Sequence, residues 1–214
     1  GTDSAPITPV DDVTREFYDF DDSLAAKKIV TGDTAYVIPR RNWTTGTTYD
    51  HYEHNISSSN TANSGATNLF DSTFVVMNSA YAVYKCIEND SNTASTVEPT
   101  STSNSIVTTG DGYKWKYMYS LTSAETLNFM STDFIHVSTD STVTAAAVDG
   151  ALSHVRIKTA GSGGTNGSHT SVPIRGDGSS GAATVTISGG AVTAVTITTA
   201  GTGYTFAYIR DADI

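Results

Sequence analysis

Cysteine, positive charge and long apolar runs are scarce in this sequence. Cys86 is the single cysteine among 214 residues, which excludes a disulfide within the chain. Twelve basic residues stand against 22 acidic ones, and the net charge of −10 repels phosphate backbones, so we expect no nucleic-acid partner. No apolar run is long enough to cross a bilayer, and we expect no membrane partner. The chain begins at Gly1 rather than Met, so we expect it to be part of a longer polypeptide.

Apolar residues make up 38% of the chain and charged residues 16%, and both fractions are low for a globular protein. Thr, Ser, Gly, Ala and Asn take up the difference, which is typical of a β-rich protein with many turns. The composition changes near residue 140, after which aromatic residues become rare. We therefore predict a mainly β protein, with a first domain over residues 1–140 and a small β module over residues 141–214.

The most regular pattern lies in Gly110–Tyr119, where aromatic residues occupy every second position. These residues are Tyr113, Trp115, Tyr117 and Tyr119. Because successive side chains of a strand point to opposite sides, all four rings share one face. Gly110, Asp111 and Gly112 are predicted to form the turn that precedes this strand. We predict that the aromatic face is core, with a carbohydrate-stacking platform as the alternative.

One long amphipathic helix is predicted over residues 11–31. Its apolar residues recur at spacings of three to five and form one stripe: Val13, Phe17, Phe20, Leu24 and Ile29. Asp11 and Asp12 at its start and Lys27 and Lys28 at its end match the helix dipole.

Residues with metal-binding chemistry occur in two places. On the predicted helix, an acidic cluster is either a cation site or, as we expect, a solvated face: Asp19, Asp21 and Asp22. Residues 44–72 and 89–109 are predicted loops, and the first contains His51 and His54, which are ligand types for zinc or iron. Because His-x-x-His brings no third or fourth ligand at a recognisable spacing, we predict no metal there and no cofactor elsewhere.

Ala35–Ile38 is typical of a short strand, which Pro39 is predicted to end because proline has no N–H to donate. Arg40 and Arg41 follow directly. Two adjacent arginines either clamp a carboxylate or phosphate of a ligand or form internal salt bridges. We expect salt bridges because free carboxylates are abundant in this chain.

Further strands are predicted at Phe74–Met77 and Tyr81–Ile87. Both faces of the second strand carry apolar residues, as in the centre of a β-sandwich, with Cys86 as a small buried residue. A nucleophilic Cys86 would require a base and an orienting group that no motif supplies, so we predict no catalytic residue. Thr122–Glu125 has the form of a capping box and predicts a short helix, and another strand is predicted at Phe134–Val137.

The C-terminal part contains an internal repeat. Val155–Gly163 matches Val195–Gly203 at an offset of 195 − 155 = 40, and Thr170–Arg175 matches Thr205–Arg210 at an offset of 205 − 170 = 35. We predict that each copy forms a strand–turn–strand unit and that the copies pack on one another or on the first domain. Between the copies, a hairpin is predicted over residues 183–198.

The middle of the chain resembles a known family. The segments that carry the resemblance are Val37–Trp43, Val83–Cys86, Glu98-Pro99, Gly110–Tyr117 and, more weakly, Phe134–Val137. Their order and spacing over residues 10–137 are similar to those of the gene-eight baseplate wedge proteins of T-even-type contractile-tailed bacteriophages, and we expect a cyanophage or other marine relative. Asn42 stands where the T-even relative has Asp. Gly201–Thr205 is similar to the Gly-x-Gly-Tyr-Thr repeats of phage virion proteins.

The resemblance implies a non-enzymatic structural protein with a β-sandwich domain, one N-terminal helix and a following repeat module. It implies a homodimer that contacts other baseplate wedge proteins in the virion and is assembled in the host cytoplasm. It marks these residues as structural: Pro39, Arg40, Arg41, Trp43, Gly110, Asp111, Gly112, Tyr113 and Trp115. A glycan-binding module or adhesin of a phage tail is the alternative, with exposed Trp43, Trp115 or tyrosines as stacking platforms.

Overall fold

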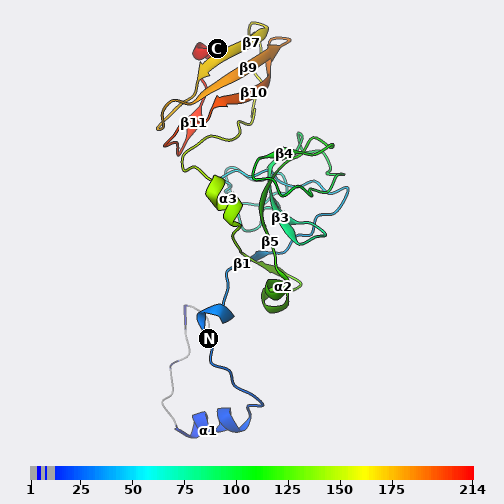
Figure 1. Cartoon of the computed structure of the whole chain (residues 1–214), viewed down its shortest axis with the longest axis vertical. Helices are drawn as coiled ribbons and strands as arrows, with labels where there is room; N and C mark the ends of the chain where they lie inside the picture. The colour runs from blue at the N-terminus through cyan, green and yellow to red at the C-terminus, as the bar shows by residue number, and fades with distance from the viewer. Residues whose placement is uncertain (1–3, 6–7, 9–12) are drawn as a thin grey trace. The chain divides into compact units, whose positions relative to one another are not determined.

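The computed structural model describes residues 4–5, 8 and 13–214, and the chain divides into two compact units, residues 1–35 and 36–214 (Figure 1). The protein is mainly β, with 30% of residues in strands and 12% in helices. Its strands form several antiparallel sheets, none of them closed into a barrel. The prediction of a mainly β protein is therefore confirmed, and the domain boundary near residue 140 stays a prediction.

In the described part of the first unit there are one α-helix and one short 3-10 helix. α1 spans Val13–Asp21 and η1 spans Thr31–Asp33, so the helix is shorter than the predicted range of residues 11–31. Residues 22–30 take no regular structure. A helix draws most of its stability from the packing of its apolar stripe. Because that stripe is exposed here, as at Phe20, nothing stabilises further turns.

Asp11, Asp12 and the side chain of Val13, which belong to the predicted first turn of this helix, lie outside the described residues. The acidic cluster that follows is exposed throughout, as predicted for a solvated face: Asp19, Asp21 and Asp22.

The second unit, all of whose residues are described, contains four sheets. The largest has four antiparallel strands in the order β2-β3-β5-β4 (Figure 1). Its strands are β2 (Val75–Met77), β3 (Ala82–Glu88), β4 (Val107–Thr108) and β5 (Lys114–Ser120). The three strands predicted for this region are confirmed as β2, β3 and β5. β4 lies inside the loop predicted over residues 89–109, because two residues are too few to show a period-two pattern.

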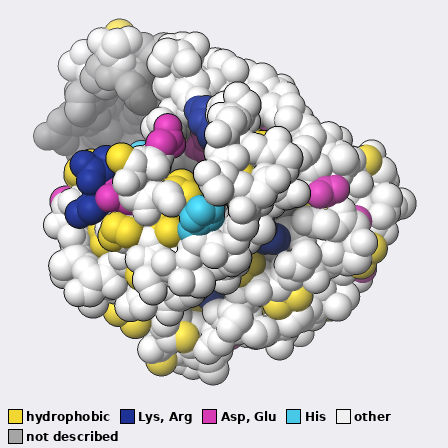
Figure 2. All heavy atoms as spheres, turned by 90° about the horizontal axis from the view of Figure 1, so that it is seen from above, with side chains coloured by type: hydrophobic (Ala, Val, Ile, Leu, Met, Phe, Trp, Pro, Cys, Tyr) yellow, Lys and Arg dark blue, Asp and Glu magenta, His cyan; other side chains and the backbone are white. Residues whose placement is uncertain are grey.

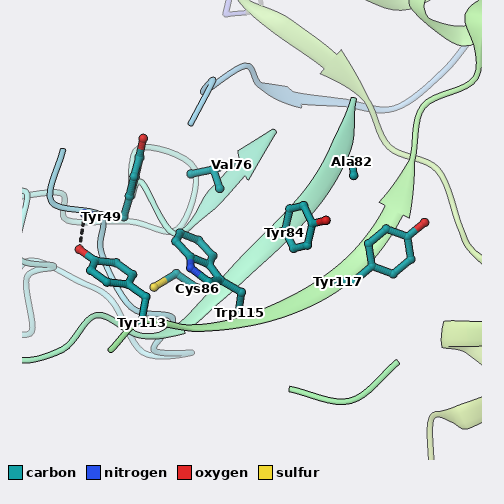
Figure 3. Close-up of a cluster of buried hydrophobic side chains, with 8 residues drawn as sticks. All are labelled: Tyr49, Val76, Ala82, Tyr84, Cys86, Tyr113, Trp115 and Tyr117. Carbon is teal, nitrogen blue, oxygen red and sulfur yellow. Dashed lines mark hydrogen bonds between the residues drawn. The ribbon is translucent and has the colours of Figure 1, made fainter. Parts of the chain in front are cut away.

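One face of β5 and of the residue before it, Tyr113, carries the aromatic core. Its side chains are at most 6% exposed: Tyr113, Trp115, Tyr117 and Tyr119. The ring of Trp115 stacks on Tyr113 with a centroid distance of 5.4 Å and meets Tyr49 edge-on at 5.9 Å (Figure 3). Cys86, opposite Trp115 in the ladder, is fully buried, and this burial raises the pKa of its thiol. The prediction of an aromatic core face with a buried Cys86 is confirmed.

A separate two-stranded sheet joins β1 (Val37–Pro39) to β6 (Phe134–His136). β6 confirms the strand predicted at Phe134–Val137. β1 begins two residues later than the predicted Ala35–Ile38 and ends one residue later, because Pro39 pairs with Phe134 instead of ending the ladder. β1 has a single neighbour strand, so the missing N–H of Pro39 costs no ladder hydrogen bond.

Two short helices flank β6. α2 (Ser123–Phe129) begins at the predicted capping box, in which the Glu125 amide donates to Thr122 Oγ1 at 3.2 Å and the Thr122 amide donates to Glu125 Oε2 at 2.7 Å. α3 (Ser141–Ala146) is N-capped by the side chain of Asp140, and no sequence pattern predicts it.

The C-terminal region forms a three-stranded sheet in the order β10-β9-β7 and a two-stranded sheet of β11 and β8. Its elements are β7 (Gly167–Pro173), β8 (Arg175–Gly176), β9 (Ala182–Ser188), β10 (Ala191–Thr199), β11 (Ala207–Tyr208) and the 3-10 helix η2 (Asp211–Asp213). β9 and β10 confirm the hairpin predicted over residues 183–198. Gly189 and Gly190 in its turn have φ of +62° and +80°, the positive values that a type I′ turn requires.

The two repeat copies contact each other but are not equivalent. β8 of the first copy pairs with β11 of the second, with Arg175 opposite Tyr208, so the copies pack on one another as predicted. Val195–Thr199 lies in β10, whereas Val155–Thr159 forms no strand. The prediction of two equivalent strand–turn–strand units is therefore wrong.

The two copies also differ in a charged contact. Arg156 of the first copy pairs with Glu53, whereas the second copy has the neutral Thr196 at the same position. The first copy runs beside β10 without forming a strand: the Leu152 amide donates to the oxygen of Ala200 at 2.9 Å, and the Val192 amide donates to the oxygen of Ala160 at 2.9 Å.

The aromatic core gives a first prediction. Trp115→Ala should lower the free energy of unfolding by about 3–5 kcal/mol, because a large core ring is removed and its cavity cannot fully collapse. Denaturant unfolding measures this change. Leu127→Ala is the control, since Leu127 is 85% exposed and its truncation should cost no more than about 0.5 kcal/mol. Equal losses in the two variants would contradict the core role of Trp115.

Candidate functional site

Two motif segments that are far apart in the sequence meet in one hydrogen-bond network. The indole Nε1 of Trp43 donates to Ser95 Oγ at 3.0 Å, and Ser95 Oγ donates to Asp111 Oδ2 at 3.0 Å. Ser95 is completely buried. No sequence pattern marks Ser95, which lies in a Ser/Thr-rich loop, so the residue that joins the two motifs is missed by sequence reasoning.

Asp111 organises the turn before β5. Its carboxylate also accepts from the amides of Thr96 and Val97, at 2.8 and 3.0 Å, and from Thr109 Oγ1 at 2.5 Å. Burial works to raise the pKa of Asp111, but the hydrogen bonds outweigh burial and lower the pKa to about 2. The carboxylate therefore holds the loop of residues 89–109 against the turn.

The neighbours of Asp111 in the motif also have structural tasks. Gly112 has φ of +86°, and a Cβ there would lie 2.6 Å from Cγ of Asp90, so no other residue fits without displacement. The hydroxyl of Tyr113 donates to the Thr93 oxygen at 2.6 Å and accepts from the Tyr49 amide at 3.2 Å. A single buried ring thus fastens both long loops to the central sheet.

The arginines that follow Pro39 bind backbone oxygens and an amide, not carboxylates. Arg40 donates through Nη1 to the Ser131 oxygen at 2.9 Å and through Nε to Asn42 Oδ1 at 3.1 Å. Arg41 Nη2 donates to the oxygen of Phe70 at 2.9 Å. Neither arginine forms a salt bridge with any residue that the structure describes, so the predicted salt bridges are wrong.

Next to Arg40, the side chain of Asn42 offers an amide oxygen and no carboxylate. The two arginines share no hydrogen bond with Ser95 or Asp111. Arg40 and Arg41, directly after β1, hold the backbone at Ser131 and at Phe70.

A buried carboxylate that is absent from the sequence-based predictions anchors the loop of residues 44–72. Asp50 is 1% exposed and accepts from the amides of Ser64 and Thr73 at 2.7 and 2.8 Å, and from Ser72 Oγ at 2.9 Å. Burial works to raise the pKa of Asp50, but these hydrogen bonds outweigh it and lower the pKa. An acid among serines and threonines is the only sequence signal, and it is not specific.

The two histidines of this loop have different surroundings. His51 Nε2 lies 3.1 Å from Glu53 Oε1, and Glu53 also pairs with Arg156, whereas His54 is exposed. Burial, helped by Arg156, lowers the pKa of His51. Among the described residues, no three His, Cys, Asp or Glu side chains gather as a metal site would require.

A second charged cluster, similar to the one around Glu53, surrounds Glu88. Its carboxylate pairs with Lys114 of β5 and lies 3.2 Å from His154 Nε2. Burial is the main cause that lowers the pKa of His154. Together with Glu53 and Arg156, this group connects residues 154–156 of the repeat region to the central sheet and its loop.

A cleft of about 820 Å³ lies beside the same segment. Its apolar lining includes Leu152, Val155, Ile157, Val192, Val195 and Ile209. The volume lies in the range of small-molecule sites. However, two polar residues at its wall, His154 and Arg156, are already engaged by Glu88 and Glu53. Figure 2 shows one face of the molecule, on which hydrophobic side chains are exposed beside basic, acidic and histidine side chains.

Comparisons of the chain with protein-family models, with curated proteins and with solved structures give no match in any of the three. None of the described helices has the length and apolar character that a membrane span requires. The functional assignment therefore depends on the residues themselves, and the geometry gives the motif residues tasks in holding the fold.

The Asp111 carboxylate gives a prediction on pH dependence. Asp111→Asn should lower the free energy of unfolding at pH 7 by about 1.5–3 kcal/mol, because hydrogen bonds to a charged acceptor are lost. The pKa is lower in the folded than in the unfolded chain, so this contribution is complete above about pH 4. It is lost as the pH falls towards 2, the pKa of the folded state.

Denaturant unfolding of both proteins between pH 7 and pH 2 measures this difference. The exposed Asp133→Asn is the matched control and should change stability by no more than about 0.5 kcal/mol at any of these pH values. A stability difference between the wild type and Asp111→Asn that stays constant down to pH 2 would contradict the role of the carboxylate charge.

The histidine pair gives a prediction on metal content. Elemental analysis of the purified protein should find no stoichiometric zinc or iron, because Glu53 and Arg156 already engage the His51 side and His54 stands alone at the surface. One zinc or iron per chain, lost in the His51→Ala/His54→Ala variant, would overturn this prediction.

Proposed function

We propose that this chain is a structural virion protein of a contractile-tail baseplate wedge, where it pairs with a second copy and joins neighbouring wedge proteins. The observation that carries the proposal is the Trp43–Ser95–Asp111 network. It connects the two segments with the strongest family resemblance. The side chains of this network hold loops on a sheet, which is the task of a structural protein.

The anchoring of the loops supports the same role. Asp50, Asp111 and Tyr113 fasten two long polar loops to the central sheet through buried and half-buried hydrogen bonds. Loops fixed on a rigid sheet present a defined surface to neighbouring subunits. A protein that transmits mechanical change between subunits depends on such fixed loops.

The proposal includes the finer architecture and the setting that the family resemblance implies. Residues 1–140 form a β-sandwich domain with an N-terminal amphipathic helix, and residues 141–214 form a repeat module. The protein is not an enzyme, and it binds no cofactor, nucleic acid or membrane. It assembles in the host cytoplasm and resides in the tail baseplate.

The glycan-binding alternative has less support. Stacking of a sugar ring requires an exposed aromatic face. Trp115 is 1% exposed, and Trp43 is half-buried, with its indole nitrogen bonded to Ser95. The two tryptophans named for that function therefore serve the core.

Immunoelectron microscopy tests the proposed function. Antibodies raised against the purified chain, applied to contractile-tailed particles from the source of the sequence, should label the baseplate end of the tail. Antibodies absorbed with the same protein are the control. Label confined to the capsid or to fibre tips, or a chain absent from the purified particles, would contradict the wedge assignment. Binding of the chain to immobilised host glycans would favour the adhesin instead.

A further inference from the structure

Residues 153–159, here called the strap, run beside β10 without pairing with it. Two backbone bonds hold the chain there: the Leu152 amide donates to the oxygen of Ala200, and the Val192 amide donates to the oxygen of Ala160, both at 2.9 Å. Between these two bonds, no backbone hydrogen bond joins residues 153–159 to residues 193–199, all of which the structure describes. The strap is therefore fastened beside β10 at both ends and is unpaired along its middle.

The two end bonds belong to the register of one antiparallel ladder. The residue numbers of opposed positions in such a ladder add up to a constant, and both bonds give 352 (152 + 200 and 160 + 192). Seven residues lie between the bonds on each side (159 − 153 + 1 = 199 − 193 + 1 = 7). β10 has two register shifts against β9, so a ladder with the strap keeps this register at its ends and is irregular between them. The strap can therefore pair with β10 without a shift of either end.

The internal repeat accounts for this fit. A shift by the repeat offset of 40 residues turns each end bond into the other (152 + 40 = 192 and 200 − 40 = 160). The same shift exchanges two further backbone bonds, from the Tyr204 amide to the oxygen of Gly150 at 3.0 Å and from the Gly164 amide to the oxygen of Gly190 at 2.9 Å. An exchange of this kind indicates a local two-fold axis between the two copies.

Equivalent segments of the two copies pair across such an axis. β8 of the first copy already forms an antiparallel ladder with β11 of the second copy. The strap and residues 193–199 are the other two equivalent segments, and they do not pair. As an outer strand of its sheet, β10 keeps unpaired N–H and C=O groups on the side of the strap, and such groups are a template for a further strand.

Two side chains connect the strap to the central region instead. Arg156 pairs with Glu53, and His154 Nε2 lies 3.2 Å from Glu88 Oε2. β10 has a threonine and an alanine at the equivalent positions, so these contacts are not open to it. The four side chains keep between 17% and 30% of their surface exposed, which limits the strength of both contacts.

Pairing of the strap with β10 would add stabilising terms of its own. Val155 and Ile157 of the strap line the same cleft as Val192 and Val195 of β10. Closing the ladder brings these apolar side chains together and satisfies the free backbone groups of β10. Two positions of the strap therefore compete, one held by charged contacts and the other by a ladder and apolar burial.

We propose that the strap is a switch between these two positions. In the open position, which this structure has, Arg156 and His154 hold the strap on the central region. In the closed position residues 153–159 pair with β10 as a fourth strand of the C-terminal sheet. The switch couples the attachment of that sheet to the completion of its edge, and it stands apart from the proposed function.

Hydrogen exchange of the full chain, followed by mass spectrometry, tests the closed position. Arg156→Thr gives the strap the residue that β10 has and removes the contact with Glu53. The amides of residues 153–159 should then exchange at least about tenfold more slowly, because ladder bonds protect them. Lys158→Thr is the matched control in the same segment. Lys158 is exposed and forms no ion pair with any residue that the structure describes, so its exchange should equal that of the wild type.

A change on the other side of the contact separates the switch from the strand preference of threonine. Glu53→Gln removes the charge that holds Arg156 and leaves the sequence of the strap unchanged. Exchange of residues 153–159 should slow at least about threefold. Glu98→Gln is the control, because Glu98 accepts from the Ser79 amide and not from the strap. Unchanged exchange of β3 and β5 should show that all four variants keep the central sheet.

Each outcome decides one part of the inference. Slower exchange in both Arg156→Thr and Glu53→Gln, with both controls unchanged, supports the switch. Slower exchange in Arg156→Thr alone would overturn the role of Glu53 in holding the strap. Unchanged exchange in both variants would overturn the closed position, and wild-type strap amides that exchange as slowly as those of β9 would overturn the open one. None of these results bears on the baseplate assignment, which has its own test.

Discussion

The packing of Trp115 against Tyr113, which it stacks on, and Tyr49, which it meets edge-on, is the contact on which the central region depends. Burying a ring of about 200 Å² at about 25 cal/mol per Å² contributes roughly 5 kcal/mol, several times the value of an exposed ion pair. Tyr113 and Tyr49 also carry the hydrogen bonds that fasten the long loops. Sheet and loops therefore share one set of buried rings, and a change at Trp115 reaches both.

Two carboxylates hold loops in this fold, the buried Asp50 and the half-buried Asp111. Asp50 and Asp111 each collect donors from backbone amides and from serine or threonine hydroxyls. Because every burial of a charge is costly unless it is hydrogen-bonded, each carboxylate requires several donors. This requirement gives a physical reason for the high content of serine and threonine in the loops, where these side chains replace a hydrophobic interior.

The strength of a local pattern decides how much of the fold is predictable from the sequence. The aromatic alternation of β5, the capping box at Thr122 and the Gly189-Gly190 turn are local signals, and all three predictions are confirmed. The same reasoning is wrong for Val155–Thr159, which forms no strand and whose Arg156 pairs with Glu53, 103 positions away. No period in the sequence records such a contact.

The candidate site, too, is predictable from the sequence only in part. The motifs predict that Trp43 and Asp111 matter, but not that Ser95 joins them, because a buried serine in a Ser/Thr-rich loop looks like its neighbours.

Electrostatics then limits how copies of so acidic a protein associate. Residues 1–35 hold 8 acidic and 3 basic residues (3 − 8 = −5), and the remaining −10 − (−5) = −5 lies in residues 36–214, so both parts repel a second copy. A contact between two copies therefore has to exclude most carboxylates or pair them with basic side chains. Added salt screens the overall repulsion between the copies. The hydrophobic part of a contact persists under such screening, so the affinity of the proposed homodimer should rise from low to physiological salt. Analytical ultracentrifugation at two salt concentrations measures this, and an affinity that falls as salt is added would contradict it.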